Sequence, residues 1–378
     1  MFPAIAVIFV ALWQFATVEA NYGGNWTALY CVGDRQRQPA LNAAEHVYLF
    51  RRSTGFDGQF YHYIAHDPFL RSDLKSYVDD ARLRYRRILV PLLAWTLAFG
   101  QSAYVDRAYE AVFLLSVALG VYWSSRIAQR EGLSPAWGLL FLAMPAIPIT
   151  ADRLVVDAAL AALTAGFLYY SATPSWKLFV VLACAALARE TGVFLLIACC
   201  AWLLWQRKSR LALLFSLAAL PMLGWYADVS AHTVRSSIHF SYIPMAEIWS
   251  AIQHPVVYPA STPMVRAVVL ADHLAMAGML LCFALAFWMF ARRPQAPAGL
   301  LLLLFVAPAI IFPAADNWIT VYHFGRVHSP ELLAVASIAA ATRNPWLLAP
   351  VAMMLPRIAI QLTPQALGIL HWIGIAAL

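Results

Sequence analysis

The chain has 378 residues, and its 26 basic and 19 acidic side chains give it a formal charge of +7. Hydrophobic residues make up 62% of it and charged residues only 12%, whereas a soluble domain carries roughly 25% charged residues. This composition excludes a disordered chain and a disulfide scaffold, and it argues strongly against a water-soluble enzyme. The long apolar blocks predict an all-α, polytopic transmembrane bundle that forms one domain over residues 1–378.

The first apolar run, residues 3–18, contains no charge. Residues 18–20, Val-Glu-Ala, fit the small-x-small pattern of a signal-peptide cleavage site, but the positive segment that precedes such a peptide is missing. We therefore expect a retained first helix rather than a cleaved signal.

Further apolar segments follow at residues 88–100, 108–125, 136–150, 154–171, 176–188, 191–205, 211–226, 266–290, 298–313, 329–342, 346–361 and 366–378. The segment 88–100 begins next to Arg87, contains Pro91 and is shorter than the ~20 residues that a span needs. We predict that it is an interfacial or re-entrant helix. The other segments, with the first helix, predict about 12 spanning helices.

Basic residues in short loops predict the cytoplasmic side of a membrane protein. The basic clusters are Arg126/Arg130, Lys177, Arg207/Lys208/Arg210, Arg292/Arg293 and Arg343. If all of them are cytoplasmic, so are both termini, and nearly every other polar cluster lies outside. These include a first outer loop at 20–87, with interfacial helices, and a second at 228–265. One polar face favours chemistry or recognition there, whereas a transporter places polar residues near the midplane.

The richest polar stretch of the first outer loop is 55–61, Gly-Phe-Asp-Gly-Gln-Phe-Tyr. Asp57 precedes a glycine, which lets a ligand approach the backbone closely. Gln59 can both donate and accept a hydrogen bond, and Tyr61 suits a helix at the membrane interface. The alternative for Asp57 is a structural role as a turn or N-cap residue.

His62 and His66 are four residues apart, so they share one face of a helix and could ligate a metal. No third ligand is evident in the sequence. We therefore assign no metal ligands, and a divalent metal stays open as a cofactor.

Four arginines occur within residues 82–87, at the end of the first outer loop. Arginine forms bidentate, charge-assisted bonds to phosphate, so these four arginines are candidates for holding the phosphate or pyrophosphate of a lipid carrier. The alternative is a basic rim that contacts lipid headgroups in general.

Charged residues also interrupt the apolar segments. Asp152 and Arg153 end one segment, and Asp157 lies one turn into the next. Burying an ionised group in an apolar segment costs free energy, so such a residue is interpreted as functional by default. Arg153 and Asp157 are four residues apart, a spacing that favours an ion pair. A purely structural pair is the alternative. Arg189 and Glu190 lie where a hairpin must turn, and they either cap that turn or face the same outer cavity.

The last polar stretch, 322–331, reads Tyr-His-Phe-Gly-Arg-Val-His-Ser-Pro-Glu. Arg326 follows a glycine, which again allows close approach to an anion. His323 and His328 could carry protons near neutral pH, although a histidine at a membrane interface is more often a satisfied hydrogen-bonding group.

The order of these motifs resembles the GT-C superfamily of integral-membrane glycosyltransferases. The matching stretches are the aspartate motif at 56–61, the basic stretch with proline at 85–93, the Asp-Arg…Asp hairpin at 152–157, Ala-Arg-Glu-Thr-Gly at 188–192 and Gly-Arg-x-His-Ser-Pro at 325–330. The resemblance covers most of the chain in topology but only these short stretches in motif.

This resemblance implies an inverting glycosyltransferase that uses a polyprenyl-phosphate-linked sugar at the outer face, with a glycan, lipid or protein as acceptor. Asp57 would be the general base or aid metal binding. The residues that would bind substrate are Gln59, Tyr61, Arg86, Arg87, Asp152, Arg153, Asp157, Arg189, Glu190, His323, Arg326 and His328. The first loop has Asp-Gly where some relatives have Asp-Glu or Glu-x-Asp-Glu, which leaves metal dependence open.

Among these residues, Arg86, Arg87, Arg189 and Arg326 would hold the departing lipid phosphate and stabilise its charge. The expected location is a bacterial inner membrane, with the active face outward and membrane lipids as neighbours.

Other functions stay open beside this one. They are a transporter or flippase of lipid-linked glycans, an oligosaccharide ligase, and a non-catalytic membrane scaffold. The sequence has no Gly-rich phosphate loop and no soluble basic domain with interleaved aromatic residues, so neither a P-loop nucleotide nor a nucleic acid is an expected partner.

Overall fold

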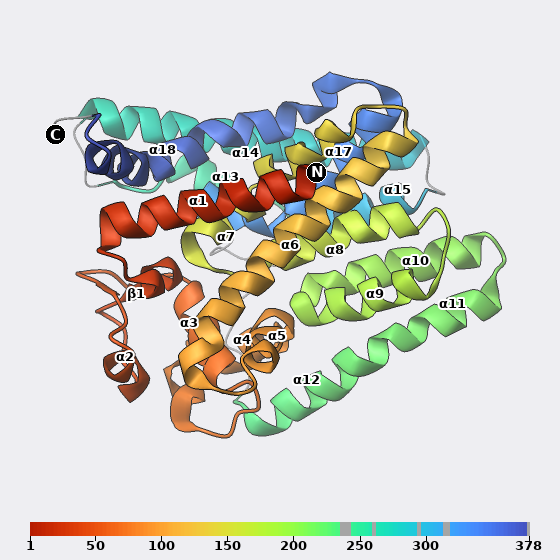
Figure 1. The fold of residues 1–378 in the computed structure, drawn as a ribbon. Helices are drawn as coiled ribbons and strands as arrows, with labels where there is room; N and C mark the ends of the chain where they lie inside the picture. The colour runs from red at the N-terminus through yellow and green to blue at the C-terminus, as the bar shows by residue number, and fades with distance from the viewer. Residues whose placement is uncertain (235–242, 259–261, 293–295, 313–317, 376–378) are drawn as a thin grey trace.

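The computed structural model describes residues 1–234, 243–258, 262–292, 296–312 and 318–375. Helices dominate these residues (Figure 1), which confirms the all-α prediction. Two short strands, β1 (Val32–Gly33) and β2 (Leu49–Phe50), pair in parallel inside the first loop.

The α-helices are α1 (Phe2–Tyr22), α2 (Ala40–Ala44), α3 (Gly58–His66), α4 (Ala81–Arg86), α5 (Leu89–Leu97), α6 (Ser102–Arg130), α7 (Ala146–Arg153), α8 (Asp157–Tyr170), α9 (Trp176–Ala188), α10 (Val193–Trp205), α11 (Ser209–Ser216), α12 (Leu220–His232), α13 (Ala246–Gln253), α14 (Thr262–Arg292), α15 (Pro297–Ile311), α16 (Val321–Val327), α17 (Ser329–Thr342) and α18 (Ala349–Trp372). The 3₁₀ helices are η1 (Trp26–Tyr30), η2 (Asp73–Tyr77), η3 (Pro135–Ala143), η4 (Glu190–Gly192), η5 (Leu217–Ala219) and η7 (Pro345–Leu348).

Within the described residues, five helical runs are long and apolar enough to cross a membrane: Phe2–Tyr22, Ser102–Arg130, Ser209–His232, Pro263–Arg292 and Pro345–Trp372. The pair η3 and α7, bent by 56°, would make a sixth. Helices α9, α10, α15 and α17 are apolar but shorter than a perpendicular span requires. Five or six helical runs therefore meet the length criterion, against the 12 spans expected.

Two sequence-based boundaries were wrong. The segments 346–361 and 366–378, expected as two helices, contribute to one helix, α18, which contains Pro356 and Pro364. Apolar helices tolerate proline when neighbouring groups satisfy the freed backbone atoms. The segment 136–150, expected as one helix, breaks between η3 and α7. Helix α5 has nine residues, too few to span, as expected.

Helix α8 lies in the middle of the bundle, where it packs against α6, α7, α9 and α17. Nearly all of its side chains are buried, and many are small, including Ala158, Ala161, Ala162 and Ala165. Small side chains let apolar helices approach closely. This packing puts Asp157, the first residue of α8, inside the molecule.

The first loop and two of the basic clusters lie at opposite ends of the bundle, as the arrangement of the ribbon indicates (Figure 1). The elements of residues 20–87 gather where α1 ends and α6 begins, whereas the end of α6 and the α10–α11 connection lie at the opposite side. The last two turns of α6 carry Arg126 and Arg130, and the α10–α11 connection with the start of α11 carries the 207–210 cluster. The fold thus separates the polar first loop from two of the basic clusters.

Gly58, the first residue of α3, lies against the backbone of two other segments. A Cβ atom there would collide with the carbonyl oxygens of Arg153 and Tyr30. We expect Gly58→Ala to destabilise the protein by about 1–3 kcal/mol, because the backbone cannot yield as a side chain can. The matched control is Gly224→Ala on exposed α12, where a Cβ meets nothing within 4 Å. Thermal unfolding in detergent should show a lower midpoint for Gly58→Ala only. Equal midpoints would contradict the close approach.

Candidate functional site

The carboxylate of Asp57 contacts two arginines that come from distant parts of the chain. Arg84 of α4 places Nη1 2.7 Å from Oδ2 and Nη2 2.9 Å from Oδ1. Arg326 of α16, 269 positions later, places Nη2 2.5 Å from Oδ2. Asp57 is the N-cap residue of α3, but its side chain makes no capping hydrogen bond. The residue thus occupies the N-cap position, but its carboxylate contacts arginines instead of capping the helix.

These two guanidinium groups keep Asp57 ionised. Burial by itself would raise the pKa of this carboxyl, but the charges of Arg326 and Arg84 hold it well below its usual value. The side chain is 18% exposed, so the carboxylate can be reached from solvent. Two neighbouring guanidinium groups also repel a divalent cation, so the residues around Asp57 do not fit a metal.

Arg326 extends the contacts inward to the start of α8. Its Nη1 atom lies 3.4 Å from Asp157 Oδ2, and Arg189, between α9 and η4, pairs with the other oxygen of Asp157. Asp157 is 2% exposed. The guanidinium of Arg326 also lies over the ring of Phe56, 4.8 Å from its centroid.

The expected pair between Arg153 and Asp157 does not form. Leu154 has a left-handed backbone, with φ of 40°, and ends α7 before α8 begins. The two residues therefore lie on different helices, and the four-residue spacing no longer brings them together. Arg153 instead pairs with Asp152 at 3.1 Å and donates to Cys31 Sγ at 2.7 Å.

Arg87 and Glu190 form a bidentate pair beside Arg189. Arg87 Nε and Nη2 donate to the two oxygens of Glu190, both at 2.7 Å, and Arg87 Nη1 donates to the Tyr61 hydroxyl at 3.0 Å. Arg189 Nε lies 3.7 Å from Glu190 Oε1. We call the connected side chains the arginine network: Arg84, Arg87, Arg189, Arg326, Asp57, Asp79, Asp157 and Glu190.

Some side chains of the arginine network are buried, and others are partly exposed. Arg189, Arg326 and Asp157 are at most 6% exposed, whereas Glu190 is 32% exposed. Four guanidinium groups face four carboxylates, a balance of 4 − 4 = 0, and Asp79 is the most exposed of these carboxylates at 43%. Among the described residues, Arg189 Nε and Arg326 Nε have no hydrogen-bond acceptor. Unused guanidinium donors beside a partly exposed carboxylate suit an anion.

Only two of the four arginines in residues 82–87 enter the arginine network. Arg84 and Arg87 are three residues apart and share one side of α4 and its end, whereas Arg86 points elsewhere and lies over the ring of Tyr226 at 5.1 Å. Arg82 donates to the Ser230 carbonyl at 2.7 Å. The structure thus puts Arg84, not Arg86, beside Asp57. The three-residue spacing was the available signal for Arg84.

Gln59 lies outside the arginine network. Its side chain is buried, accepts from the Gly33 backbone N–H at 3.3 Å and donates to the Thr54 carbonyl at 3.0 Å. These bonds fasten the start of α3 to the preceding loop, so Gln59 positions Asp57.

Asp152 forms a separate buried group. It accepts hydrogen bonds from the Tyr322 hydroxyl at 3.0 Å and from Gln365 Nε2 at 2.7 Å, besides its pair with Arg153. These contacts tie α7 to α16 and α18. Because these contacts satisfy both side chains, Asp152 and Arg153 stabilise the packing of α7 beside the arginine network.

The two histidines of the late motif differ in surroundings. Burial and the charge of Arg326 lower the pKa of His323 to about 4, so the ring is neutral at pH 7 and the expected charge near neutrality is wrong for this residue. Its Nδ1 atom lies 3.0 Å from Thr320 Oγ1. His328 pairs with Glu331 at 2.7 Å and stacks on Trp318, the contacts of a satisfied histidine.

The comparisons supply no relative from which a role could be transferred. No protein family model, no curated protein and no solved structure matches the chain. The resemblance to the GT-C superfamily therefore rests on the sequence motifs alone.

Proposed function

We propose that the chain is an inverting, membrane-embedded glycosyltransferase that takes its sugar from a polyprenyl-phosphate donor. The observation that carries this proposal is the contact of one first-loop carboxylate, Asp57, with both Arg84 and Arg326. The reaction needs a base for the acceptor hydroxyl and cations for the leaving phosphate. Here the candidate base, Asp57, lies within hydrogen-bond distance of the candidate cations, Arg84 and Arg326.

Donor binding would change the state of Asp57. The donor phosphate is an anion and competes with Asp57 for the guanidinium groups of Arg84 and Arg326. When these groups turn to the phosphate, the cause of the low pKa of Asp57 weakens. The carboxylate then becomes a better proton acceptor only while donor is bound, which limits the reaction to the loaded enzyme.

The transfer step then balances without a metal. The acceptor oxygen attacks the anomeric carbon, and Asp57 takes the hydroxyl proton. The bond between the anomeric carbon and the phosphate oxygen breaks, and its electron pair stays on that oxygen. Arg84 and Arg326 stabilise the extra negative charge of the leaving phosphate. Attack from the face opposite the phosphate inverts the anomeric centre.

The topology proposed with this function has about 11 spans, since α18 takes the place of two of the 12 expected ones (12 − 1 = 11), with an outward active face and a bacterial inner membrane. An odd number of spans puts the two ends of the bundle's chain on opposite sides, which corrects the expectation that both are cytoplasmic; the end of α18 lies beside the end of α1, where Asn21 donates to the Gln365 carbonyl. Helices α9, α10, α15 and α17 would cross where polar segment ends enter the membrane or the bilayer is thin. The distribution of charge supports the orientation, since the basic ends of α6 and α10 lie opposite the first loop (Figure 1).

One observation favours transport of lipid-linked glycans as the second candidate function. Asp272 of α14 pairs with Arg357 of α18 at 2.8 Å, and both helices belong to candidate spans. Tyr258 donates to Asp272 at 2.5 Å. Charged residues inside spans often mark a transport pathway, and this pair did not feature in the sequence-based interpretation.

A donor-turnover assay separates these functions. Purified protein is supplied with radiolabelled polyprenyl-phosphate sugars, nucleotide sugars or a diphosphate-linked oligosaccharide, plus a membrane extract as the source of acceptors. We expect release of polyprenyl phosphate and transfer of label from the monophosphate donors. Turnover of the diphosphate-linked oligosaccharide alone would indicate a ligase. Movement of an uncleaved fluorescent donor across liposomes, with no turnover, would overturn the proposal in favour of transport.

A further inference from the structure

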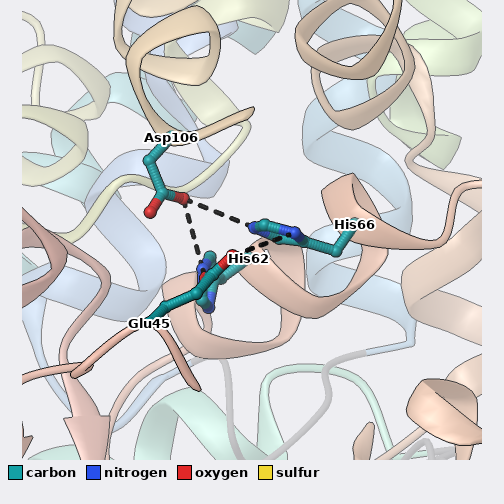
Figure 2. Close-up of side chains that lie close together, drawn as sticks. All are labelled: Glu45, His62, His66 and Asp106. Carbon is teal, nitrogen blue, oxygen red and sulfur yellow. Dashed lines mark ion pairs between the residues drawn. The ribbon is translucent and has the colours of Figure 1, made fainter. Parts of the chain in front are cut away.

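A second polar cluster lies at the other end of α3 from Asp57, and it consists of Glu45, His62, His66 and Asp106 (Figure 2). Helix α3 presents the two histidines one turn apart. Glu45 directly follows α2, and Asp106 lies just inside α6. One ligand atom from each of the four side chains lies within 4.8 Å of the others.

The distances inside this cluster match those of a small metal site. His62 Nε2 is 3.3 Å from Glu45 Oε2 and 3.2 Å from Asp106 Oδ1. His66 Nε2 is 3.7 Å from the same Asp106 oxygen. Zinc binds imidazole nitrogen and carboxylate oxygen at about 2.0–2.2 Å, so neighbouring ligand atoms in a tetrahedral site are about 3.4 Å apart. The three measured separations bracket that value.

The ligand atoms are also buried, and their close contacts are ion pairs with one another. Among the described residues, His62 Nε2, His66 Nε2, Glu45 Oε2 and Asp106 Oδ1 make no hydrogen bond of good geometry, although the separations within this group include ion pairs of 3.2, 3.3 and 3.7 Å. The His62 side chain has an exposure of 0%. Buried polar atoms without partners are costly, and they are rare in folded proteins unless a water or an ion satisfies them. Glu45 and Asp106 are partly exposed, which leaves a route for an ion to enter.

Neighbouring groups orient the ligands. Ser102 Oγ donates to Glu45 Oε1 at 2.7 Å, so its lone pairs can accept from His66 Nδ1 at 2.9 Å. A proton on Nδ1 leaves the Nε2 lone pair of His66 free for a metal. The ring of Tyr30 lies 4.5 Å from that of His62 and fixes its plane. Outer contacts of this kind are typical of metal-binding histidines.

We propose that Glu45, His62, His66 and Asp106 bind one divalent transition-metal ion, with Zn²⁺ as the best fit. Two imidazoles and two carboxylates suit zinc, whereas Ca²⁺ and Mg²⁺ prefer oxygen ligands. The two carboxylates neutralise the charge of the ion. Four protein ligands that leave no open position are typical of a structural site.

Such an ion would fasten the first loop to α6. Glu45 and both histidines belong to the loop, and Asp106 belongs to the long helix. Because α3 carries Asp57 at its start, the ion would also hold that carboxylate in register with Arg326. The proposal does not depend on the proposed function, since metal binding is measured without any sugar donor.

The competing occupant of the cluster is a proton. Burial alone would lower the pKa of His62, but Asp106 and Glu45 raise it to about 9. Without a metal, protonated His62 therefore balances part of the carboxylate charge. The experiment must show that Zn²⁺ takes the place of this proton.

Metal content of the full-length protein tests the proposal directly. Protein purified in detergent without a polyhistidine tag is stripped with chelator, equilibrated with Zn²⁺ and desalted, and its zinc is measured by mass spectrometry. We expect about one Zn²⁺ per chain in the natural protein and close to none in the double variant His62→Gln, His66→Gln. His232→Gln is the matched control, because this histidine is 54% exposed and pairs only at the surface with Asp228.

Two measurements on the natural protein need no variant. Zn²⁺ should raise the thermal midpoint of the stripped protein by about 4 °C or more. Co²⁺ should give the intense visible absorption of a tetrahedral site. Equal zinc content in the natural protein and the double variant would overturn the proposal. So would an unchanged midpoint together with the weak spectrum of hydrated Co²⁺.

Discussion

Replacement of Asp57 by asparagine is expected to lower the turnover number of sugar transfer by about 10²–10⁴-fold, the usual contribution of a general base. The amide keeps the shape of the carboxylate but cannot take the proton of the acceptor hydroxyl. The Michaelis constant for the donor should stay the same or fall, since the neutral amide no longer competes with the donor phosphate for Arg84 and Arg326. Initial rates at varied donor concentration measure both constants.

The separate effects on the turnover number and on the Michaelis constant distinguish a catalytic role of Asp57 from a structural one. If Asp57 only held Arg326 in place, Asp57→Asn would raise the Michaelis constant and leave turnover nearly intact. The matched control is Asp73→Asn, an exposed aspartate of the same loop, which should behave as the natural protein. Full turnover in Asp57→Asn, with normal expression and unfolding, would refute the role of this carboxylate as base.

Replacement of Asp157 by asparagine is expected to give the largest loss of stability, about 3–5 kcal/mol in the free energy of unfolding. Asp157 is 2% exposed and is shared by Arg189 and Arg326, which are themselves almost fully buried. Its removal leaves two neighbouring buried cations without their common carboxylate. Unfolding in mixed micelles of mild detergent and dodecyl sulfate measures the change.

A double variant tests the physical reason for that loss. In Asp157→Asn, Arg189→Gln the excess cation is gone, so part of the stability should return. The control is Asp228→Asn, which breaks an ion pair whose side chains are 54% and 48% exposed and should change stability by less than about 1 kcal/mol. A double variant that is less stable than Asp157→Asn alone would contradict the electrostatic explanation.

Several elements could be predicted from sequence because local patterns control them. The apolar runs 176–188 and 329–342 form α9 and α17 with the same boundaries, since a polar or proline-containing stretch ends each run. The short helix α5 was expected from the length of its segment. By contrast, α18 runs through Pro364, where sequence suggested a break, because packing against α14 and α1 outweighs the local cost of proline.

The residue types of the site were recognisable, but their partners were not. Asp57, Arg87, Asp157, Arg189 and Arg326 were expected as functional because charge is costly in an apolar chain. Arg84 was not among the residues expected to bind substrate, and Arg153 was paired with the wrong aspartate, since the left-handed Leu154 that separates α7 from α8 has no clear sequence signal. Likewise, His62 and His66 were visible as a pair, whereas Glu45 and Asp106 reach them only through the fold.

Composition and hydropathy by themselves therefore determined the helical class, the apolar character and the short list of charged residues. These properties follow from residue types and from their spacing along the chain, which the sequence gives directly. Only the tertiary structure decided which charges meet. The contact between Asp57 and Arg326 joins residues 269 positions apart, and it depends on how α3, α8 and α16 pack. Coulomb attraction acts over distances in space rather than along the sequence, so the arginine network appears only once the helices are in place.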